Sequence, residues 1–291
     1  MYVLACPCIL DPSLRARGIT SDADRTAFSR ALERCRKAGI EVVSLPCPET
    51  RYLGKDREPG TFLERLNTPE FRKIQLDLAE EVRKIIDERG PPLCIVGVDS
   101  SPTCGVTATW YGSVEGIPPK RPGRGSFLSL LADIPAIDVK LFARYRVYLA
   151  APLFSEAERA YNREIATLLT GRFFEVFLPQ DIGDDSAARS ADGNREIFER
   201  DLAAVQDADL VVAVIDGADA DSGTAWEMGY AFALGKPVVA LRTDFRMAGH
   251  HERVNLMLEM SSAVVGSKAD LLEALFPLKR DGAHGPHRDG A

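Results

Sequence analysis

The sequence lacks any apolar run long enough to cross a membrane, and it has no cysteine after residue 104. A spanning helix needs about 18 or more consecutive apolar residues, and no stretch approaches that length. A secretory signal peptide is not expected either, because Asp11 and Arg15 interrupt the first apolar residues. We therefore expect a cytoplasmic protein whose cysteines are reduced thiols.

The absence of several sequence motifs argues against some classes of protein. The sequence has no internal repeat, no coiled-coil heptads, no P-loop and no GxGxxG motif, so neither a repeat protein nor a dinucleotide-binding fold is indicated. Its 36 basic and 43 acidic residues give a net charge of −7. Binding to polymeric nucleic acid needs clustered positive charge, which this balance does not favour. Small molecules are the expected partners.

Length and cysteine distribution indicate two domains. A chain of 291 residues exceeds the usual range for one hydrophobic core, and all six cysteines lie in the first 104 residues. We place the boundary near Ala143, giving one domain over residues 1–143 and a second over residues 144–278. The remaining residues, 279–291, are rich in Gly, His, Asp and Arg and are expected to be a disordered tail.

The second domain has the pattern of an α/β fold. Residues 210–215 form a continuous apolar run, typical of a parallel strand covered on both faces. A helix is expected to begin near Thr224 and to end at Gly235, before a second buried strand at residues 238–241. With shorter strands upstream, these elements predict a flavodoxin-like domain with a five-stranded parallel sheet. Ligands bind beyond the carboxyl ends of such strands, which places residues 216–227 at the functional edge.

Glu227 is the main catalytic candidate in this segment. A carboxylate in the first turn of a helix lies near the positive end of the helix dipole, which favours its ionised form at neutral pH. An ionised, shielded carboxylate can act as a nucleophile. The alternative is structural, because Thr224 and Glu227 also have the spacing of a capping box, in which the Glu accepts the N-cap amide.

Several ordered motifs carry a family resemblance. They are Tyr-Leu-Ala-Ala-Pro-Leu-Phe from Tyr148, Glu-Arg-Asp-Leu around Asp201, Asp-Ser-Gly-Thr-Ala-Trp-Glu-Met-Gly-Tyr-Ala from Asp221, and Val-Asn-Leu-Met around Asn255. Together, over residues 146–276, they resemble the nucleoside 2-deoxyribosyltransferase family. The resemblance implies that a glutamate attacks the anomeric carbon of a 2′-deoxyribosyl group, with retention of configuration after a second transfer.

The same resemblance implies a role for each matched residue. Glu227 would be the nucleophile, Tyr148 would orient it, and Asp201 and Asp221 would handle the base and the sugar. Asn255 and Met257 would complete the site, partly across a subunit interface, so the active protein would be a homo-oligomer. Further positions implied to contact substrate are Ala151, Pro152, Phe154, Asp216, Ser222 and Gly223.

These residues also have ordinary structural explanations. Asp201 could be a solvated charge on a helix face, and Asp221 could be an N-cap or turn residue. The segment around Asn255 could be an amphipathic helix with Leu256, Leu258 and Met260 in its core.

The first domain places thiols at strand ends. Strand-like segments at residues 2–5, 41–45 and 93–98 are followed by Cys8, Cys47 and Cys104. The carboxyl ends of parallel strands share one edge, so these thiols could converge and suit a soft metal or an iron–sulfur cluster. Cys35 and Cys94 fall inside a helix and a strand and are expected to be small core residues.

The residues around these thiols also resemble a family. Cys8-Ile-Leu-Asp, Cys47-Pro-Glu and Ser101-Pro-Thr-Cys-Gly are similar to the DUF523 family, which includes the bacterial thiouracil desulfidases. The resemblance spans residues 1–112. It implies a four-iron four-sulfur (4Fe-4S) cluster on Cys8, Cys47 and Cys104 with one open iron that takes sulfur from a thiolated base. Glu49 and Ser101 would be its acid–base residues.

The sequence differs from the DUF523 pattern in two places, and the cysteines also have a structural explanation. The family commonly has Gly where this sequence has Asp11, and Cys6 is close enough to Cys8 to compete as a ligand. The alternative is that all these cysteines are reduced structural thiols.

The reaction of the second domain has three alternatives. A nucleoside deoxyribosyltransferase passes the sugar to a second base, and an N-hydrolase passes it to water. A nucleoside-binding sensor would keep the pocket without turnover. A hydrolase of nucleoside 5′-phosphates usually has a Gly-rich first loop, and residues 150–153 contain no glycine, which favours unphosphorylated nucleosides. No cofactor is expected in this domain.

Overall fold

The computed structural model describes residues 1–112, 120–181, 191–247 and 252–278. The chain forms two compact units, one over Met1–Ala143 and one over Arg144–Pro277. The segment expected to be a disordered tail, residues 279–291, lies outside the described residues. Among the helices of the described ranges, none has the length and apolar composition needed to cross a membrane.

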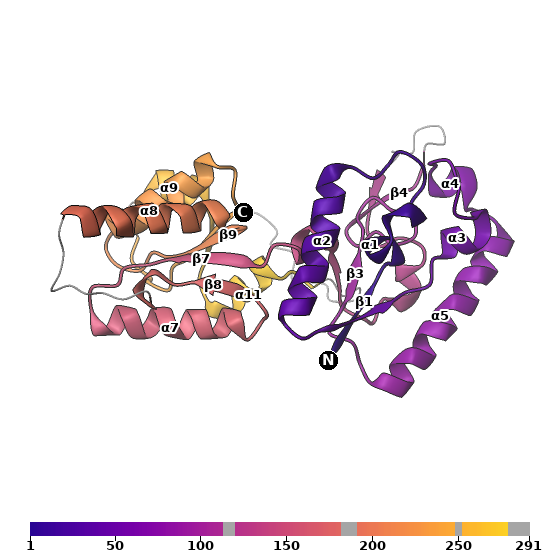
Figure 1. Cartoon of the computed structure of the whole chain (residues 1–291), viewed down its shortest axis with the longest axis horizontal. Coiled ribbons are helices and arrows are strands. Elements are labelled where there is room, and N and C mark those ends of the chain that lie inside the picture. The colour runs from indigo at the N-terminus through magenta and orange to yellow at the C-terminus, as the bar shows by residue number, and fades with distance from the viewer. Residues whose placement is uncertain (113–119, 182–190, 248–251, 279–291) are drawn as a thin grey trace. The chain divides into compact units, whose positions relative to one another are not determined.

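The first unit is built on a four-stranded parallel sheet in the order β2-β1-β3-β6. Figure 1 shows the long helices α2 and α5 on opposite sides of its strands. Its elements are β1 (Tyr2–Ala5), α1 (Pro7–Leu10), α2 (Asp22–Lys37), β2 (Glu41–Ser44), α3 (Pro48–Leu53), α4 (Phe62–Arg65), α5 (Pro69–Arg89), β3 (Ile95–Gly97), β4 (Ala108–Trp110), β5 (Lys120–Pro122), β6 (Ala136–Asp138) and α6 (Val139–Phe142).

Local signals explain where the helices of this unit start and stop. In α2, the side chain of Ser21 accepts the Asp24 amide, and the Asp24 side chain accepts the Ser21 amide in return. In α5, Thr68 caps the first turn and Gly90, at φ 80°, ends the helix in a conformation that favours glycine.

The second unit confirms the flavodoxin-like prediction. Its five parallel strands have the order β11-β10-β9-β7-β8, so the strand order reverses between β7 and β9. Its elements are β7 (Arg146–Ala150), α7 (Glu156–Thr170), β8 (Glu175–Phe177), α8 (Ala191–Asp207), β9 (Leu210–Val214), α9 (Ser222–Ala233), β10 (Val238–Leu241), α10 (Leu256–Ser261), β11 (Ala263–Val265) and α11 (Lys268–Leu275).

Strand alternation divides the core of this unit into two layers. Val147 and Leu149 of β7 pack with α7 and α11 on one face of the sheet. Tyr148 and Ala150 point to the other face, where they join buried residues of α8 and α9 such as Met228. Figure 1 shows α7 and α11 on one side of the strands and α8 and α9 on the other. The period of two therefore directs Tyr148 toward α9.

Candidate functional sites

Tyr148 and Glu227 meet at the edge where the strand order reverses. Tyr148 is the third residue of β7 and is fully buried. Its hydroxyl donates a hydrogen bond to Oε1 of Glu227 on α9 at 2.5 Å. The Tyr148 ring also stacks on Phe177 of β8, with centroids 5.5 Å apart, which fixes its direction. The structure thus joins two residues that are 79 positions apart in sequence.

Burial controls the charge of Glu227. Removal from water raises its pKa to about 7, the hydrogen bond from Tyr148 opposes this shift, and the charges of Asp201 and Asp221 add to it. The expectation that the helix dipole keeps Glu227 ionised is wrong, because Glu227 is the sixth residue of α9 and the dipole acts mainly on the first turn. At neutral pH the carboxyl group is poised between its two forms.

The start of α9 differs from the sequence prediction. The helix begins at Ser222, and Asp221 is its N-cap, with Oδ2 accepting from the Thr224 amide at 3.0 Å. Thr224 is therefore inside the helix and does not cap it, so the capping-box explanation of Glu227 is wrong. The structural explanation of Asp221 as an N-cap is confirmed. The same carboxylate is close enough to raise the pKa of Glu227, so capping does not exclude a second role.

Asp201 lies on α8 in the same electrostatic neighbourhood. Its charge contributes to the raised pKa of both Glu227 and Tyr148. Burial raises the pKa of Asp201, while Arg200 opposes the shift through two hydrogen bonds to Oδ1, at 2.9 and 3.0 Å. Only 20% of the Asp201 side chain is exposed, so it is not a freely solvated helix charge.

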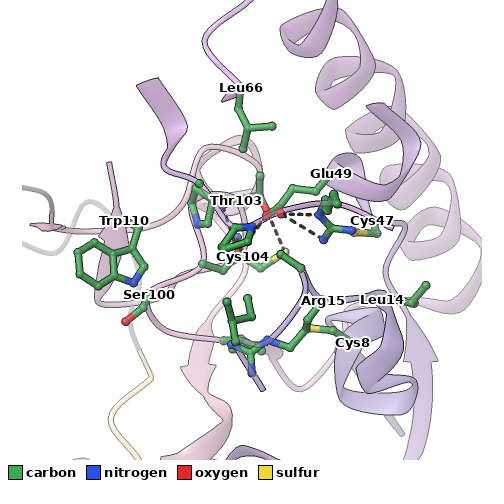
Figure 2. A pocket seen from close by; sticks show the side chains of 18 of the residues that line it. Cys8, Leu14, Arg15, Cys47, Glu49, Leu66, Ser100, Thr103, Cys104 and Trp110 are labelled. Atoms are coloured by element: carbon green, nitrogen blue, oxygen red, sulfur yellow. Dashed lines mark hydrogen bonds and ion pairs between the residues drawn. The ribbon is translucent and has the colours of Figure 1, made fainter. Parts of the chain in front are cut away.

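A cavity of about 540 Å³ in the first unit gathers the cysteine motifs (Figure 2). Cys8 of α1, Cys47 at the N-cap of α3 and Cys104 after β3 all line it, together with Glu49 and Ser101. The convergence follows from the parallel sheet, since these segments leave the carboxyl ends of neighbouring strands. Cys8 lies in the short helix α1, directly after β1.

Hydrogen bonds connect the polar residues of this cavity. The hydroxyl of Thr103 donates to Oε1 of Glu49 at 2.7 Å, and the hydroxyl of Ser101 lies 3.4 Å from the same oxygen. The guanidinium of Arg57 pairs with the other oxygen, Oε2, at 3.2 Å. Sequence reasoning missed Thr103 and Arg57. Thr103 stands beside Cys104 within a noted motif, whereas nothing in the sequence distinguishes Arg57 from the charged residues around it.

The surroundings of Cys6, Cys8 and Cys47 favour the neutral thiol over the thiolate. Burial raises the pKa of Cys8 and of Cys47, and a thiol–thiol hydrogen bond to Cys104 followed by burial raises that of the fully buried Cys6. Within the described ranges, no three His, Cys, Asp or Glu side chains lie close enough together to hold a metal ion. Three soft thiols facing one cavity still form a donor set that suits an iron–sulfur cluster, and ligation would require them to lose protons and close on the ions. Cys8 lines the cavity, whereas Cys6 is not among the residues around it.

Comparison with known proteins identifies the family of the second unit. A family model described as nucleoside 2-deoxyribosyltransferase matches residues 147–263. Through this unit, the chain belongs to the nucleoside 2-deoxyribosyltransferase family. The residues of the Tyr148–Glu227 site all lie within the matched range, so we refer to residues 144–277 as the deoxyribosyltransferase unit.

Individual relatives match part of the chain. A protein of Thermofilum pendens named "Putative 2'-deoxynucleoside 5'-phosphate N-hydrolase 1" is 33% identical over 104 residues, covering 35% of this chain and 71% of the relative. An uncharacterized protein of Ureaplasma parvum is 31% identical, covering 38% of this chain and 78% of the relative. A solved structure of a 2-deoxyribosyltransferase from Bacillus psychrosaccharolyticus is 27% identical, with 43% and 89% of the two chains covered and a TM-score of 0.38.

The first unit matches a second family model. Residues 1–122 match a model described as "Putative 2-thiouracil desulfurase". This range contains Cys8, Cys47, Cys104, Glu49 and Ser101, and we refer to residues 1–143 as the desulfurase-like unit. The chain therefore matches two family models whose descriptions refer to a nucleobase or to nucleosides.

Some residues expected to contact substrate in the deoxyribosyltransferase unit serve the fold. Asp216 accepts hydrogen bonds on both carboxylate oxygens, from the Thr243 amide and hydroxyl and from the Asp244 amide, so it ties β9 to the segment after β10. The carbonyl of Pro152 accepts from the side chain of Asn162 at 2.8 Å. The other positions are near solvent or partly buried: Phe154 is 71% exposed, Ser222 and Gly223 are exposed in the first turn of α9, and Ala151 is partly buried against the core.

The α10 segment is not the amphipathic core helix described by the structural alternative. Asn255 is its N-cap and accepts the Met257 amide at 3.0 Å. Leu258 is buried, but Leu256 and Met260 are 51% and 72% exposed, and Met257 is 76% exposed. Assigning Leu256 and Met260 to the core is therefore wrong.

Proposed function

We propose that the deoxyribosyltransferase unit cleaves the N-glycosidic bond of 2′-deoxynucleosides through a covalent intermediate on Glu227. The observation that carries this proposal is the hydrogen bond between Tyr148 and the half-buried Glu227 at the carboxyl edge of the sheet. Oε2 is the oxygen left for chemistry, because Oε1 accepts the hydroxyl of Tyr148. As Oε2 bonds to C1′, the C1′–N bond breaks and the base leaves with the electron pair.

Asp201 and Asp221 are the proposed proton-handling residues. The leaving base needs a proton, and burial raises the pKa of Asp201, which favours its protonated form. A second base, or water, then attacks C1′ and releases the Glu227 carboxylate. Two displacements at the same carbon give net retention of configuration.

We also propose that the unit functions as a homo-oligomer. Trp226 on α9 and Met257 and Met260 on α10 are 50%, 76% and 72% exposed, and α9 and α10 contact each other. Exposed large apolar side chains gathered on adjoining helices indicate a protein interface. A second copy covering α10 would bring Asn255 and Met257 to a boundary between subunits, as the family resemblance implies.

Hydrolysis is the second candidate reaction. The relative from Thermofilum pendens is named as a hydrolase of 2′-deoxynucleoside 5′-phosphates, and it shares 33% identity with this chain. Both reactions use the same first step and differ only in whether a base or water attacks the intermediate.

Incubation of the purified full chain with deoxyinosine and adenine tests these functions. Deoxyadenosine is the product expected from transfer, hypoxanthine without deoxyadenosine indicates hydrolysis, and neither product indicates a nucleoside-binding sensor. The same assay with deoxyinosine 5′-monophosphate tests whether the unit acts on a phosphorylated substrate. Glu227→Ala should abolish turnover, whereas Glu164→Gln, at an exposed glutamate on the opposite face of the sheet, should not.

For the desulfurase-like unit we propose that Cys8, Cys47 and Cys104 hold a 4Fe-4S cluster and that the unit removes sulfur from thiolated nucleobases. When bound, the cluster would supply an iron site that accepts the sulfur. Glu49 and Ser101 would activate and orient the water that replaces it, since both line the cavity and share a short network. We further propose that the base passes between this reaction and the sugar chemistry of the other unit.

Anaerobic purification tests the cluster. The full chain should show a broad visible absorption band, lost in Cys47→Ala, with iron and sulfide bound in near-equal amounts. Cys35→Ser, at a buried thiol on α2, serves as the control and should keep the band. If Cys47→Ala affects neither the band nor sulfide release from thiouracil, the proposed site is wrong.

A further inference from the structure

Arg57 lies in the wall of the desulfurase-like cavity and makes four directional contacts. Its Nε and Nη2 donate to Oε2 of Glu49 at 3.3 and 3.2 Å. Its Nη1 donates to the hydroxyl of Thr50 and to the carbonyl of Gly54, both at 3.2 Å. The side chains of Arg57 and Glu49 are only 5% and 15% exposed. A guanidinium that bonds one carboxylate through two nitrogens fixes both its position and its plane.

The other side of the Glu49 carboxylate is also held. Its Oε1 accepts the hydroxyl of Thr103 at 2.7 Å, and Thr103 is 1% exposed. Two hydroxyls of this network also approach a thiol: that of Thr50 lies 3.1 Å from Sγ of Cys47, and that of Thr103 lies 3.5 Å from Sγ of Cys104. Figure 2 shows dashed contacts converging on the carboxylate of Glu49, with Cys47 and Cys104 among the labelled residues around it.

The ion pair is unlike the surface pairs of the same unit. Arg17 and Asp56, for example, are paired at 2.6 Å but are 58% and 80% exposed, so water screens them. A largely buried pair loses the hydration of both partners, and removal of one leaves the other charge unpaired. Glu49 stands in the first turn of the short helix α3, and its flexible side chain could otherwise adopt several rotamers. The contacts of Arg57 and Thr103 select one.

We propose that Arg57 is a positioning residue, which holds the Glu49 carboxylate in the cavity that Cys47 and Cys104 also line, at the orientation needed for desulfuration. The proposal rests on the proposed function of this unit. Arg57 acts through Glu49, so its removal should impair turnover rather than thiobase binding.

A double-mutant cycle tests this coupling. With cluster content matched, Arg57→Met should lower the kcat for sulfide release about 100-fold with little change in KM, because a displaced catalytic group can lose that much. Arg57→Lys should lower kcat by a smaller factor, because the lysine ammonium keeps the positive charge but cannot bond Glu49 through two nitrogens as the guanidinium does. In the Glu49→Gln background, Arg57→Met should cause little further loss. Equal losses in both backgrounds would overturn the proposal.

Arg124→Met provides the matched control. Arg124 is also buried, and its guanidinium bonds the carbonyls of Leu128, Leu131 and Ile134. Its substitution removes a buried guanidinium without touching Glu49, so its effect on kcat should add to that of Glu49→Gln.

A crystal structure of Arg57→Met separates this proposal from the proposed function. Displacement of the Glu49 carboxylate from Thr103 supports positioning by Arg57 even when the wild-type protein releases no sulfide, a result that would overturn only the desulfuration. An unmoved carboxylate overturns the role of Arg57 even when the wild-type protein is active. Chains that fail to fold with methionine are replaced by Arg57→Lys in the same comparison.

Discussion

At the scale of single residues, the chemistry of the deoxyribosyltransferase unit depends on how burial and hydrogen bonding balance at Glu227. Burial raises its pKa to about 7, and Tyr148 is the main group that opposes this shift. A carboxylate that is partly desolvated is more reactive than one in water, but it must be ionised to attack. The Tyr148 hydroxyl therefore helps to keep the proposed nucleophile ionised near neutral pH.

Tyr148→Phe should shift the pH dependence of glycosidic cleavage. The wild-type kcat/KM should rise with pH and level off above about 7, as Glu227 loses its proton. Loss of the hydrogen bond should raise that pKa and lower activity at pH 7 about tenfold, because a hydrogen bond to a charged group contributes about 1.5–3 kcal/mol. Activity should recover partly at alkaline pH. An unchanged midpoint, measured from full pH profiles, would contradict this assignment.

At the scale of elements, α9 combines its N-cap, Asp221, with the proposed nucleophile, Glu227. Asp221 caps the helix through the Thr224 amide and also acts electrostatically on Glu227. The capping role of Asp221 can be separated from its proposed role in proton transfer. Asparagine caps a helix about as well as aspartate, but it cannot act as an acid.

Asp221→Asn should keep the stability of the unit and lose activity. Asp221→Ala should lose both, with the free energy of unfolding reduced by about 1 kcal/mol through the lost cap. Urea denaturation measures the first property and nucleoside turnover the second. Full activity in the stable Asp221→Asn variant would limit Asp221 to capping.

The exposed side chains of α10 provide a test of the proposed oligomer. Met257→Glu together with Met260→Glu should dissociate the proposed oligomer and reduce cleavage, because charged groups are unfavourable in the apolar centre of an interface. Sedimentation velocity gives the molecular mass. Leu76→Glu, at a 46% exposed leucine on α5 of the other unit, is the control and should leave the mass unchanged. A monomeric wild-type protein with full activity would refute the oligomer.

At the scale of the whole molecule, the two units have separate sheets and separate cores. The apolar clusters on the two faces of the second sheet contain only residues from that unit, including Tyr145, Ile165 and Leu271 on one face and Val205 and Met228 on the other. A unit with its own core can fold alone.

A fragment of residues 144–278 should therefore fold cooperatively and retain glycosidic cleavage. Its circular dichroism should show a single thermal transition, and its kcat on deoxyinosine should be within a few-fold of that of the full chain. A fragment that does not fold would show that its stability depends on the first unit. A folded but inactive fragment would show that catalysis, rather than folding, depends on it.

The sequence by itself predicted two units of strands and helices, and it supplied the residues of both proposed sites. Buried parallel strands appear in the sequence as continuous apolar runs. The motifs around Glu227 and Cys104 can be recognised because each is a short contiguous segment and the segments follow one another in order. The helix α5 shows that local sequence can also define where a helix starts and stops, because Thr68 and Gly90 lie at its two ends.

Only the tertiary structure decided the environment of those residues. The pKa of Glu227 reverses the expectation from its helix because burial is set by packing, which helical spacing does not encode. The exposure of Met260 and the cap formed by Asp221 depend likewise on neighbours and on where the helix starts. Arg57 is the clearest case, since its partner Glu49 becomes a neighbour only when the chain between them folds back on itself and buries both charges.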